Sequence, residues 1–144
     1  MEKTLVKTIW TGPGQQNPQH NRNAIVTAGD QPVIYLTSGD PEHKGLNKYI
    51  PEQLFSASLA TAFMLSFLDH CAEKKVAVLT YVDESEAGPD IVLRPRVAFS
   101  SPVSGDFFNE ILRTSRERCV LLHSCSIPVQ INAEFSIVKK APEE

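Results

Sequence analysis

Three thiols are the side chains of this 144-residue chain that are best suited to covalent chemistry, at Cys71, Cys119 and Cys125. The thiolate is the form of cysteine that reacts, and neighbouring cations favour it. Cys119 follows Arg116 and Arg118 closely, so it is the strongest candidate for a reactive thiol. Its expected place near a helix C-terminus opposes this effect, because that end of the helix dipole is negative. The alternative for each of the three is a small buried apolar side chain, the commonest role of a free cysteine.

Two charged residues, Glu52 and Arg22, are further candidates for a binding site. Glu52 falls in the first turn of an expected helix, where a carboxylate gains about 0.3–1 kcal/mol from the helix dipole. Arg22 lies in a polar, turn-rich loop, where an arginine is solvated by default. Position alone therefore does not separate a functional role from an ordinary one for either residue.

Common metal, hydrolase and nucleotide-binding motifs do not occur in the sequence. The four histidines show no metal-ligand spacing, apart from the single residue between His123 and Cys125. We therefore expect no metal ion and no cofactor.

Size and composition indicate one ordinary globular domain spanning residues 1–144. The chain has a mass of 15.9 kDa, with 42% apolar and 22% charged residues. A net charge of −3 gives no basic surface for nucleic acid. The first residues lack the apolar run of a signal peptide, and the most apolar segment, 59–68, is shorter than the roughly 20 residues that span a bilayer. Three cysteines suit a reducing compartment, so we expect a cytoplasmic protein with no membrane segment.

Alternation and turn residues predict six strands and two helices. Pro51 suits the first position of a long helix, although Ile50 before it is a poor cap. Asp106 is the expected N-cap of the second helix, and Pro95 places its strand at a sheet edge or a bulge. The expected strands are 4–11, 24–27, 32–37, 76–83, 91–100 and 127–138, and the expected helices are 51 to about 74 and 107–122.

This order predicts an α+β fold with mostly antiparallel sheets, because neighbouring strands are joined by hairpin turns. The first helix is apolar around its whole circumference, which is typical of a buried central helix. One small sheet cannot cover it on every side. Either two sheets enclose the helix or a second subunit completes the cover.

Residues 51–63, Pro-Glu-Gln-Leu-Phe followed by a run of small residues and Phe63, resemble a motif of the OsmC/Ohr family, the osmotically inducible and organic hydroperoxide resistance proteins. A second family signature, a cysteine near the end of the second helix, is matched at 115–122, with Val120 where proline is usual. The resemblance implies an OsmC-like fold: a long buried central helix packed by antiparallel sheets, in an intertwined homodimer.

The resemblance also implies a redox function tied to the oxidative stress response. Members of the family reduce organic hydroperoxides with two cysteines, and a dithiol reductant then resets the pair. Cys119 matches the second cysteine, Glu52 matches the family's glutamate, and Arg22 is the corresponding arginine of the loop. Ala62 occupies the position of the first, reactive cysteine. Because alanine forms no thiolate, the usual two-cysteine cycle cannot run.

Three functions stay open at this point. The chain is a thiol peroxidase that uses Cys119 with Arg116, Arg118 or Arg22 as cationic support, a homodimer that binds an apolar or oxidised small molecule without catalysis, or a structural dimer. Glu52 and Ala62 are ten residues apart, about 15 Å along one helix, so a conserved site would need Glu52 of the partner beside Ala62. The resemblance thus implies that Glu52 and Arg22 pair at the dimer interface, next to Ala62 of the other subunit.

Overall fold

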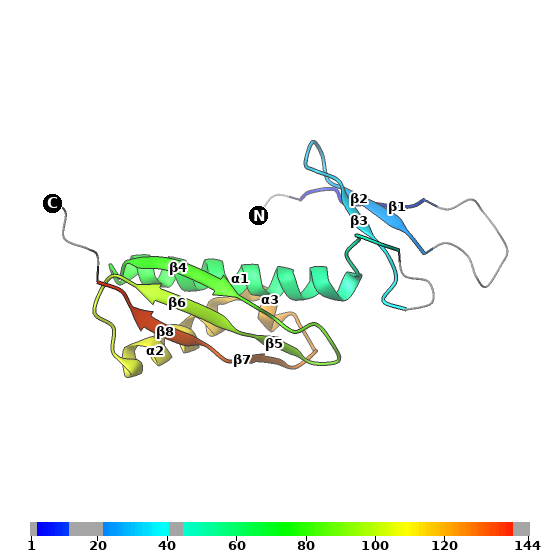
Figure 1. The fold of residues 1–144 in the computed structure, drawn as a ribbon. Helices are drawn as coiled ribbons and strands as arrows, with labels where there is room; N and C mark the ends of the chain where they lie inside the picture. Colours follow the sequence, from blue (N-terminus) through cyan, green and yellow to red (C-terminus); the bar gives the residue numbers. More distant parts are fainter. Residues whose placement is uncertain (1–2, 12–21, 41–44, 140–144) are drawn as a thin grey trace. The chain divides into compact units, whose positions relative to one another are not determined.

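The computed structural model describes residues 3–11, 22–40 and 45–139, and the chain forms two compact units. The N-terminal unit is Met1–Leu54 and the C-terminal unit is Phe55–Glu144. Helices and sheets occur together, so the predicted α+β class is confirmed (Figure 1). The elements are β1 (Lys7–Trp10), β2 (Ala24–Thr27), β3 (Ile34–Leu36), α1 (Pro51–Glu73), β4 (Val78–Asp83), β5 (Ile91–Leu93), β6 (Pro95–Phe99), α2 (Gly105–Arg118), α3 (Val120–His123), β7 (Val129–Ile131) and β8 (Glu134–Ile137).

An antiparallel sheet, in the order β1-β2-β3, makes up the N-terminal unit. The predicted hairpin between β2 and β3 is confirmed: Gln31 N–H donates to the Ala28 carbonyl at 3.1 Å. Gly29 has φ +56 in this turn, a conformation that glycine adopts without steric cost. The strand β2 has the predicted bounds, whereas β1 and β3 are shorter than predicted.

Helix α1 begins and ends close to the predicted residues, and each end has a local cause. Ile50 offers no capping side chain, and the Gln53 amide oxygen instead accepts from the Ile50 N–H at 3.0 Å. At the other end Lys75 has φ +58, and Val76 N–H donates to the Cys71 carbonyl at 2.9 Å. This 6→1 bond with a left-handed residue is a Schellman motif, which stops the helix.

The C-terminal unit contains a three-stranded sheet, β4-β6-β8, and a two-stranded sheet, β5-β7. The single predicted strand 91–100 is broken at Arg94 into β5 and β6, and Pro95 begins β6. Of the two alternatives predicted for Pro95, the sheet edge is wrong, because β6 lies at the centre of its sheet. The strand is instead interrupted just before Pro95. The two pairings of β7 and β8 are parallel rather than antiparallel. A helical crossover between β6 and these strands permits that direction.

The second predicted helix is two helices, α2 and α3, that are separated at Cys119. Cys119 has extended backbone angles, φ −82 and ψ 100, which end α2. The expected N-cap is also wrong: Ser104, not Asp106, caps α2, and its Oγ accepts from the Phe107 N–H at 3.1 Å. Asp106 lies in the first turn instead.

An aromatic cluster forms the core of the C-terminal unit between the helices and the sheet β4-β6-β8. The Phe67 ring of α1 lies 6.1 Å from Phe108 of α2 and 6.3 Å from Phe99 of β6. Phe135 of β8 contacts Phe108 at 4.5 Å between ring centroids. Figure 1 shows α1 and α2 behind the strands, and these ring contacts place both helices on the same face of the sheet.

Within the single chain, α1 is buried along one face only. Leu59, Phe63 and Phe67 are fully buried, whereas Phe55 is 40% and Leu65 53% exposed. The single chain therefore does not cover the helix on every side, and cover by a second subunit stays a prediction. The expectation of no membrane segment considered residues 59–68 alone, whereas the whole of α1 is long and apolar enough to cross a membrane. Because core helices of soluble proteins pass the same test, this finding is weak evidence for a membrane span.

Candidate functional site

An apolar cleft of about 680 Å³ lies on one face of the N-terminal sheet. The strand register places Thr8 opposite Val26 and Trp10 opposite Ala24, so these side chains share that face. Its lining residues, which we call the N-terminal cleft, are Thr8, Trp10, Arg22, Asn23, Ala24, Val26, Leu36, Thr37, Ser38 and Pro51. An apolar floor with a few polar groups at its margin is typical of small-molecule sites.

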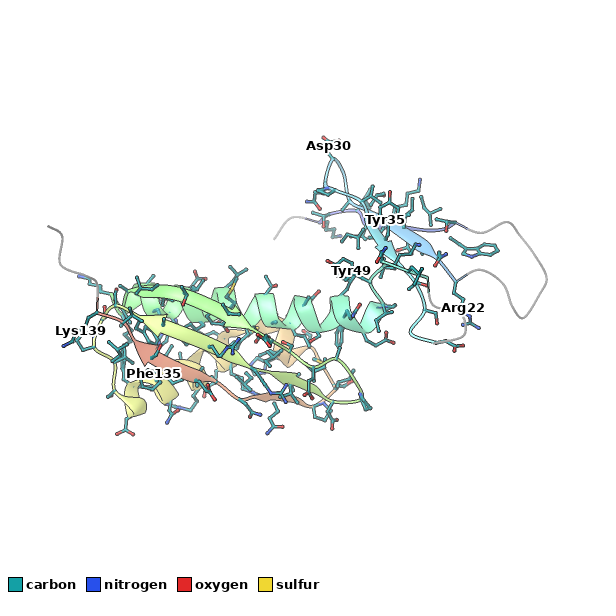
Figure 2. All side chains as sticks on the ribbon, in the orientation of Figure 1. Arg22, Asp30, Tyr35, Tyr49, Phe135 and Lys139 are labelled. Carbon is teal, nitrogen blue, oxygen red and sulfur yellow. The ribbon has the colours of Figure 1, made fainter. Side chains whose placement is uncertain are left out.

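Of the sequence-predicted site residues, the structure places Arg22 in this cleft. Figure 2 shows Arg22 at the end of the N-terminal sheet, just before β2. Its guanidinium is exposed, so it can meet the polar end of a molecule whose apolar part lies on the cleft floor.

Glu52 is exposed in the first turn of α1, as expected. Its Oε2 atom lies 3.8 Å from the place that a Cβ would take at Gly39, the residue after the cleft residue Ser38. Within the described part of one chain, Glu52 and Arg22 form no ion pair. The predicted pairing belongs to a dimer interface, so it stays a prediction.

Cys119 lies in the core of the C-terminal unit, at the break between α2 and α3. It is 4% exposed, and its backbone N–H donates to the Arg116 carbonyl at 3.2 Å. Reactive cysteines are usually partly exposed, whereas Cys119 is buried among apolar side chains.

The two arginines near Cys119 bind other groups. Arg116 donates from Nη2 to the Val129 carbonyl at 2.8 Å, and Arg118 donates from Nη1 to Glu73 Oε2 at 2.7 Å. In the single chain both guanidiniums are therefore bound to groups other than Cys119, and their support of its thiolate stays a prediction. None of the three cysteines forms a disulfide within the chain. Burial raises the pKa of Cys71 to about 11, and Cys125 Sγ donates to the Ile127 carbonyl at 3.5 Å.

Solved structures with the same fold span nearly all of the chain. An OsmC-like protein of unknown function from Vibrio cholerae has a TM-score of 0.81 and 20% identity, over 93% of this chain and 100% of its own. An OsmC-like protein from Mycoplasma pneumoniae has a TM-score of 0.68 and 14% identity, over 95% and 98%. The organic hydroperoxide resistance protein OhrB of Bacillus subtilis has a TM-score of 0.62 and 16% identity, over 94% and 98%.

The chain has the OsmC-like fold. The predicted OsmC-like fold, which rested on the motifs at residues 51–63 and 115–122, is therefore confirmed. The intertwined homodimer stays a prediction. The sequence itself matches no protein-family model and no curated protein. At these identities the likeness concerns the fold, and the roles of Arg22, Glu52 and Cys119 stay predictions.

In this OsmC-like fold Ala62 lies on α1, half-buried, and packs against the core of the C-terminal unit. The methyl group fills space there and supplies no thiol. Among the described residues, no three His, Cys, Asp or Glu side chains gather closely enough to hold a metal ion.

Most residues of the N-terminal cleft, above all Trp10 and Leu36, were not predicted from the sequence. The alternation within residues 24–27 and the Gly29 turn could have given the register of β2 and β3, and thus paired Ala24 with Leu36. The pairing of Trp10 with Ala24 crosses a long loop, and no local signal sets it.

Proposed function

We propose that the protein is a member of the OsmC/Ohr family that binds organic hydroperoxides, or other apolar oxidised molecules, without the two-cysteine peroxidase cycle. The observation that carries this proposal is the N-terminal cleft, which joins an apolar floor to the Arg22 guanidinium. The organic hydroperoxide resistance protein with the same fold supports the ligand class.

The chemistry of the cleft suits a molecule with an apolar body and an oxygen-rich end. Trp10, Val26 and Leu36 offer apolar contact area, and burial of such area contributes about 25 cal/mol per Å². Arg22 supplies several N–H donors to peroxide, hydroxyl or carboxylate oxygens. The hydroxyl groups of the cleft margin can orient the same end of the molecule.

Ala62 and the surroundings of Cys119 both disfavour the two-cysteine cycle. Ala62 carries no nucleophile, and Cys119 is buried with its neighbouring arginines bound to Val129 and Glu73. A binding role needs neither thiol. We therefore place binding ahead of catalysis.

Trp10 is the only tryptophan of the chain and lines the cleft, so its fluorescence is a direct probe of binding. We expect cumene hydroperoxide and its alcohol to change the emission in a saturable way. Arg22→Gln should weaken binding by about tenfold, because a hydrogen bond to a charged group contributes about 1.5–3 kcal/mol. Arg113→Gln, an exposed arginine in the C-terminal unit, is the matched control and should bind normally. An emission that stays constant up to the solubility limit of both compounds would remove this function.

A second candidate is a peroxidase that uses Cys119 alone, at the position of the family's second cysteine. Its thiolate would attack the peroxide, so that an S–O bond forms, the O–O bond breaks and the alcohol leaves. An external dithiol would then reduce the sulfenic acid to the thiol and water. Hydroperoxide consumption with a dithiol donor tests this cycle. Activity that is lost in Cys119→Ser and kept in Cys125→Ser would favour catalysis over binding alone.

Restoring the missing nucleophile gives a further prediction. Ala62→Cys should create dithiol-dependent turnover that the wild type lacks, if the surroundings of the family site are kept. The measurement is hydroperoxide consumption by the folded variant, with Ala57→Cys on the same helix as the control. A new thiol with ordinary alkylation kinetics and no turnover would indicate that the whole site has been lost.

We also propose that the protein works as a homodimer. Large apolar side chains are exposed in both units, among them Phe55 and Leu65 on α1, and Tyr35 in the N-terminal sheet. Obligate dimers bury such surface in interfaces that often exceed about 2,000 Å².

Sedimentation should give about twice the mass of 15.9 kDa at micromolar concentration. Leu65→Glu should raise the dimer dissociation constant at least about tenfold, because it puts a charge on the apolar face. A folded wild-type monomer would rule out the dimer.

A further inference from the structure

A cluster of three titratable or charged side chains joins the end of α1 to the end of α2. The His70 side chain, only 5% exposed, comes from α1 together with Glu73, and Arg118 is the last residue of α2. Arg118 Nη1 lies 2.7 Å from Glu73 Oε2 and 3.4 Å from His70 Nδ1. His70 Nδ1 also lies 3.6 Å from Glu73 Oε2.

The geometry distinguishes the two charge states of His70. A guanidinium N–H can only donate, so the contact at 3.4 Å is a hydrogen bond when Nδ1 carries no hydrogen, as in the neutral imidazole with its hydrogen on Nε2. The Nη1 group of Arg118 carries two hydrogens, so it then donates one to His70 and the other to Glu73. A protonated His70 has a hydrogen at Nδ1, repels the guanidinium, and competes with Arg118 for the Glu73 carboxylate.

The cluster lies directly beside the break between α2 and α3. Cys119 follows Arg118, has extended backbone angles and is 4% exposed. The four-residue helix α3 begins next, and its Val120 and Leu121 are 78% and 43% exposed. Cys119 and Leu122 pack into the core, whereas Val120 and Leu121 face solvent, so this short helix is held on one side only. Short elements with an exposed face are typical of regions that open locally.

We propose that His70, Glu73 and Arg118 form a pH-sensitive latch that keeps the junction at Cys119 closed while His70 is neutral. Protonation of His70 displaces Arg118, and the junction opens more often. The groups that face His70 are Glu73 on its own helix and Arg118 on α2. The adjacent thiol of Cys71 adds no charge at neutral pH, because burial raises its pKa to about 11. The latch concerns local opening and stands apart from the proposed binding function.

The test measures how often Cys119 becomes accessible. Its rate of modification by methyl methanethiosulfonate is divided by the rate for the urea-unfolded chain at the same pH, which removes the titration of the thiol itself. Tandem mass spectrometry separates Cys119 from Cys125. Between about pH 8 and pH 5.5, the range over which histidine changes charge, we expect this ratio to rise. The expected rise is about threefold to fivefold, as for a partly exposed ion pair.

Two variants identify the latch. His70→Gln keeps an acceptor for Arg118 and stays neutral, so its ratio should not change with pH. Arg118→Gln should show the raised ratio at both pH values. His123→Gln and Arg116→Gln are the matched controls, and both should keep the pH response. If a variant fails to fold, NMR of the wild type should show the His70 ring and the Cys119 amide titrating together. A ratio that is independent of pH in the wild type, or a response that His123→Gln removes, would overturn the latch.

Discussion

The two units of this chain differ in how they obtain their stability. The C-terminal unit has a closed aromatic core, in which Phe63, Phe67 and Phe99 are fully buried. In the described part of the N-terminal unit, only Leu36 and Thr37 fall below a tenth exposed, and Trp10 and Tyr35 remain about half exposed. The difference indicates that the C-terminal unit folds around its own core, whereas the N-terminal sheet offers apolar surface to a ligand or a second protomer.

The largest effect that tests this comparison comes from truncating one aromatic residue in each unit. Phe67→Ala should lower the free energy of unfolding by about 3–5 kcal/mol, because it removes a ring that contacts Tyr81, Phe99 and Phe108. Trp10→Ala should cost less than about 1 kcal/mol, as an exposed substitution does. Urea unfolding followed by circular dichroism measures both. Equal losses would contradict the comparison and would mean that a partner buries Trp10 in the folded state.

Sequence reasoning predicted elements well where local chemistry decides them. Pro51 and the Lys74-Lys75 pair bounded α1, and the Gly29 turn fixed the β2–β3 hairpin. The break at Cys119 could not be predicted, because Cys119 and Leu122 continue the apolar stripe of α2 across it. The parallel return of β7 and β8 depends on long-range packing, which periodicity does not record.

Of the residues that line the N-terminal cleft, the sequence pointed only to Arg22, and it did so through the family resemblance. Composition and spacing left Arg22 and Glu52 as an ordinary loop arginine and a helix-start carboxylate, and the structure places only Arg22 in the N-terminal cleft. The cleft itself is made by pairing distant strands, so no contiguous motif encodes it. The partners of Arg116 and Arg118 likewise come from other elements.

Alkaline pH should act mainly on the C-terminal unit. Burial raises the pKa of Cys71 from 9.0 to about 11, and burial, with the Asp83 charge second, raises the pKa of Tyr81. Both groups stay neutral in the folded chain, so the unfolded chain ionises first as the pH rises. The contribution of these groups to the free energy of unfolding is therefore fully present below about pH 9. It is lost between about pH 9 and 11, by about 2–3 kcal/mol for Cys71. Cys71→Ala should lose less stability over this range than the wild type, as thermal unfolding would show. An identical alkaline loss in the variant would assign it to other groups.

The smallest expected effect compares the two helix starts. Ser104→Ala removes the side chain that accepts from the Phe107 N–H, and we expect it to cost about 1 kcal/mol. Asp106→Asn keeps the size of the side chain and removes only its interaction with the helix dipole, about 0.3–1 kcal/mol. Gln53→Ala should cost a similar small amount, because the Ile50 N–H that it frees is exposed to water. The three free energies of unfolding, measured in urea, rank the caps. A larger loss for Asp106→Asn than for Ser104→Ala would restore the cap that the sequence first indicated. A Gln53→Ala loss near 2 kcal/mol would mean that a partner buries the start of α1. That part of the chain would then resemble the C-terminal unit, with its closed core, rather than the exposed N-terminal sheet.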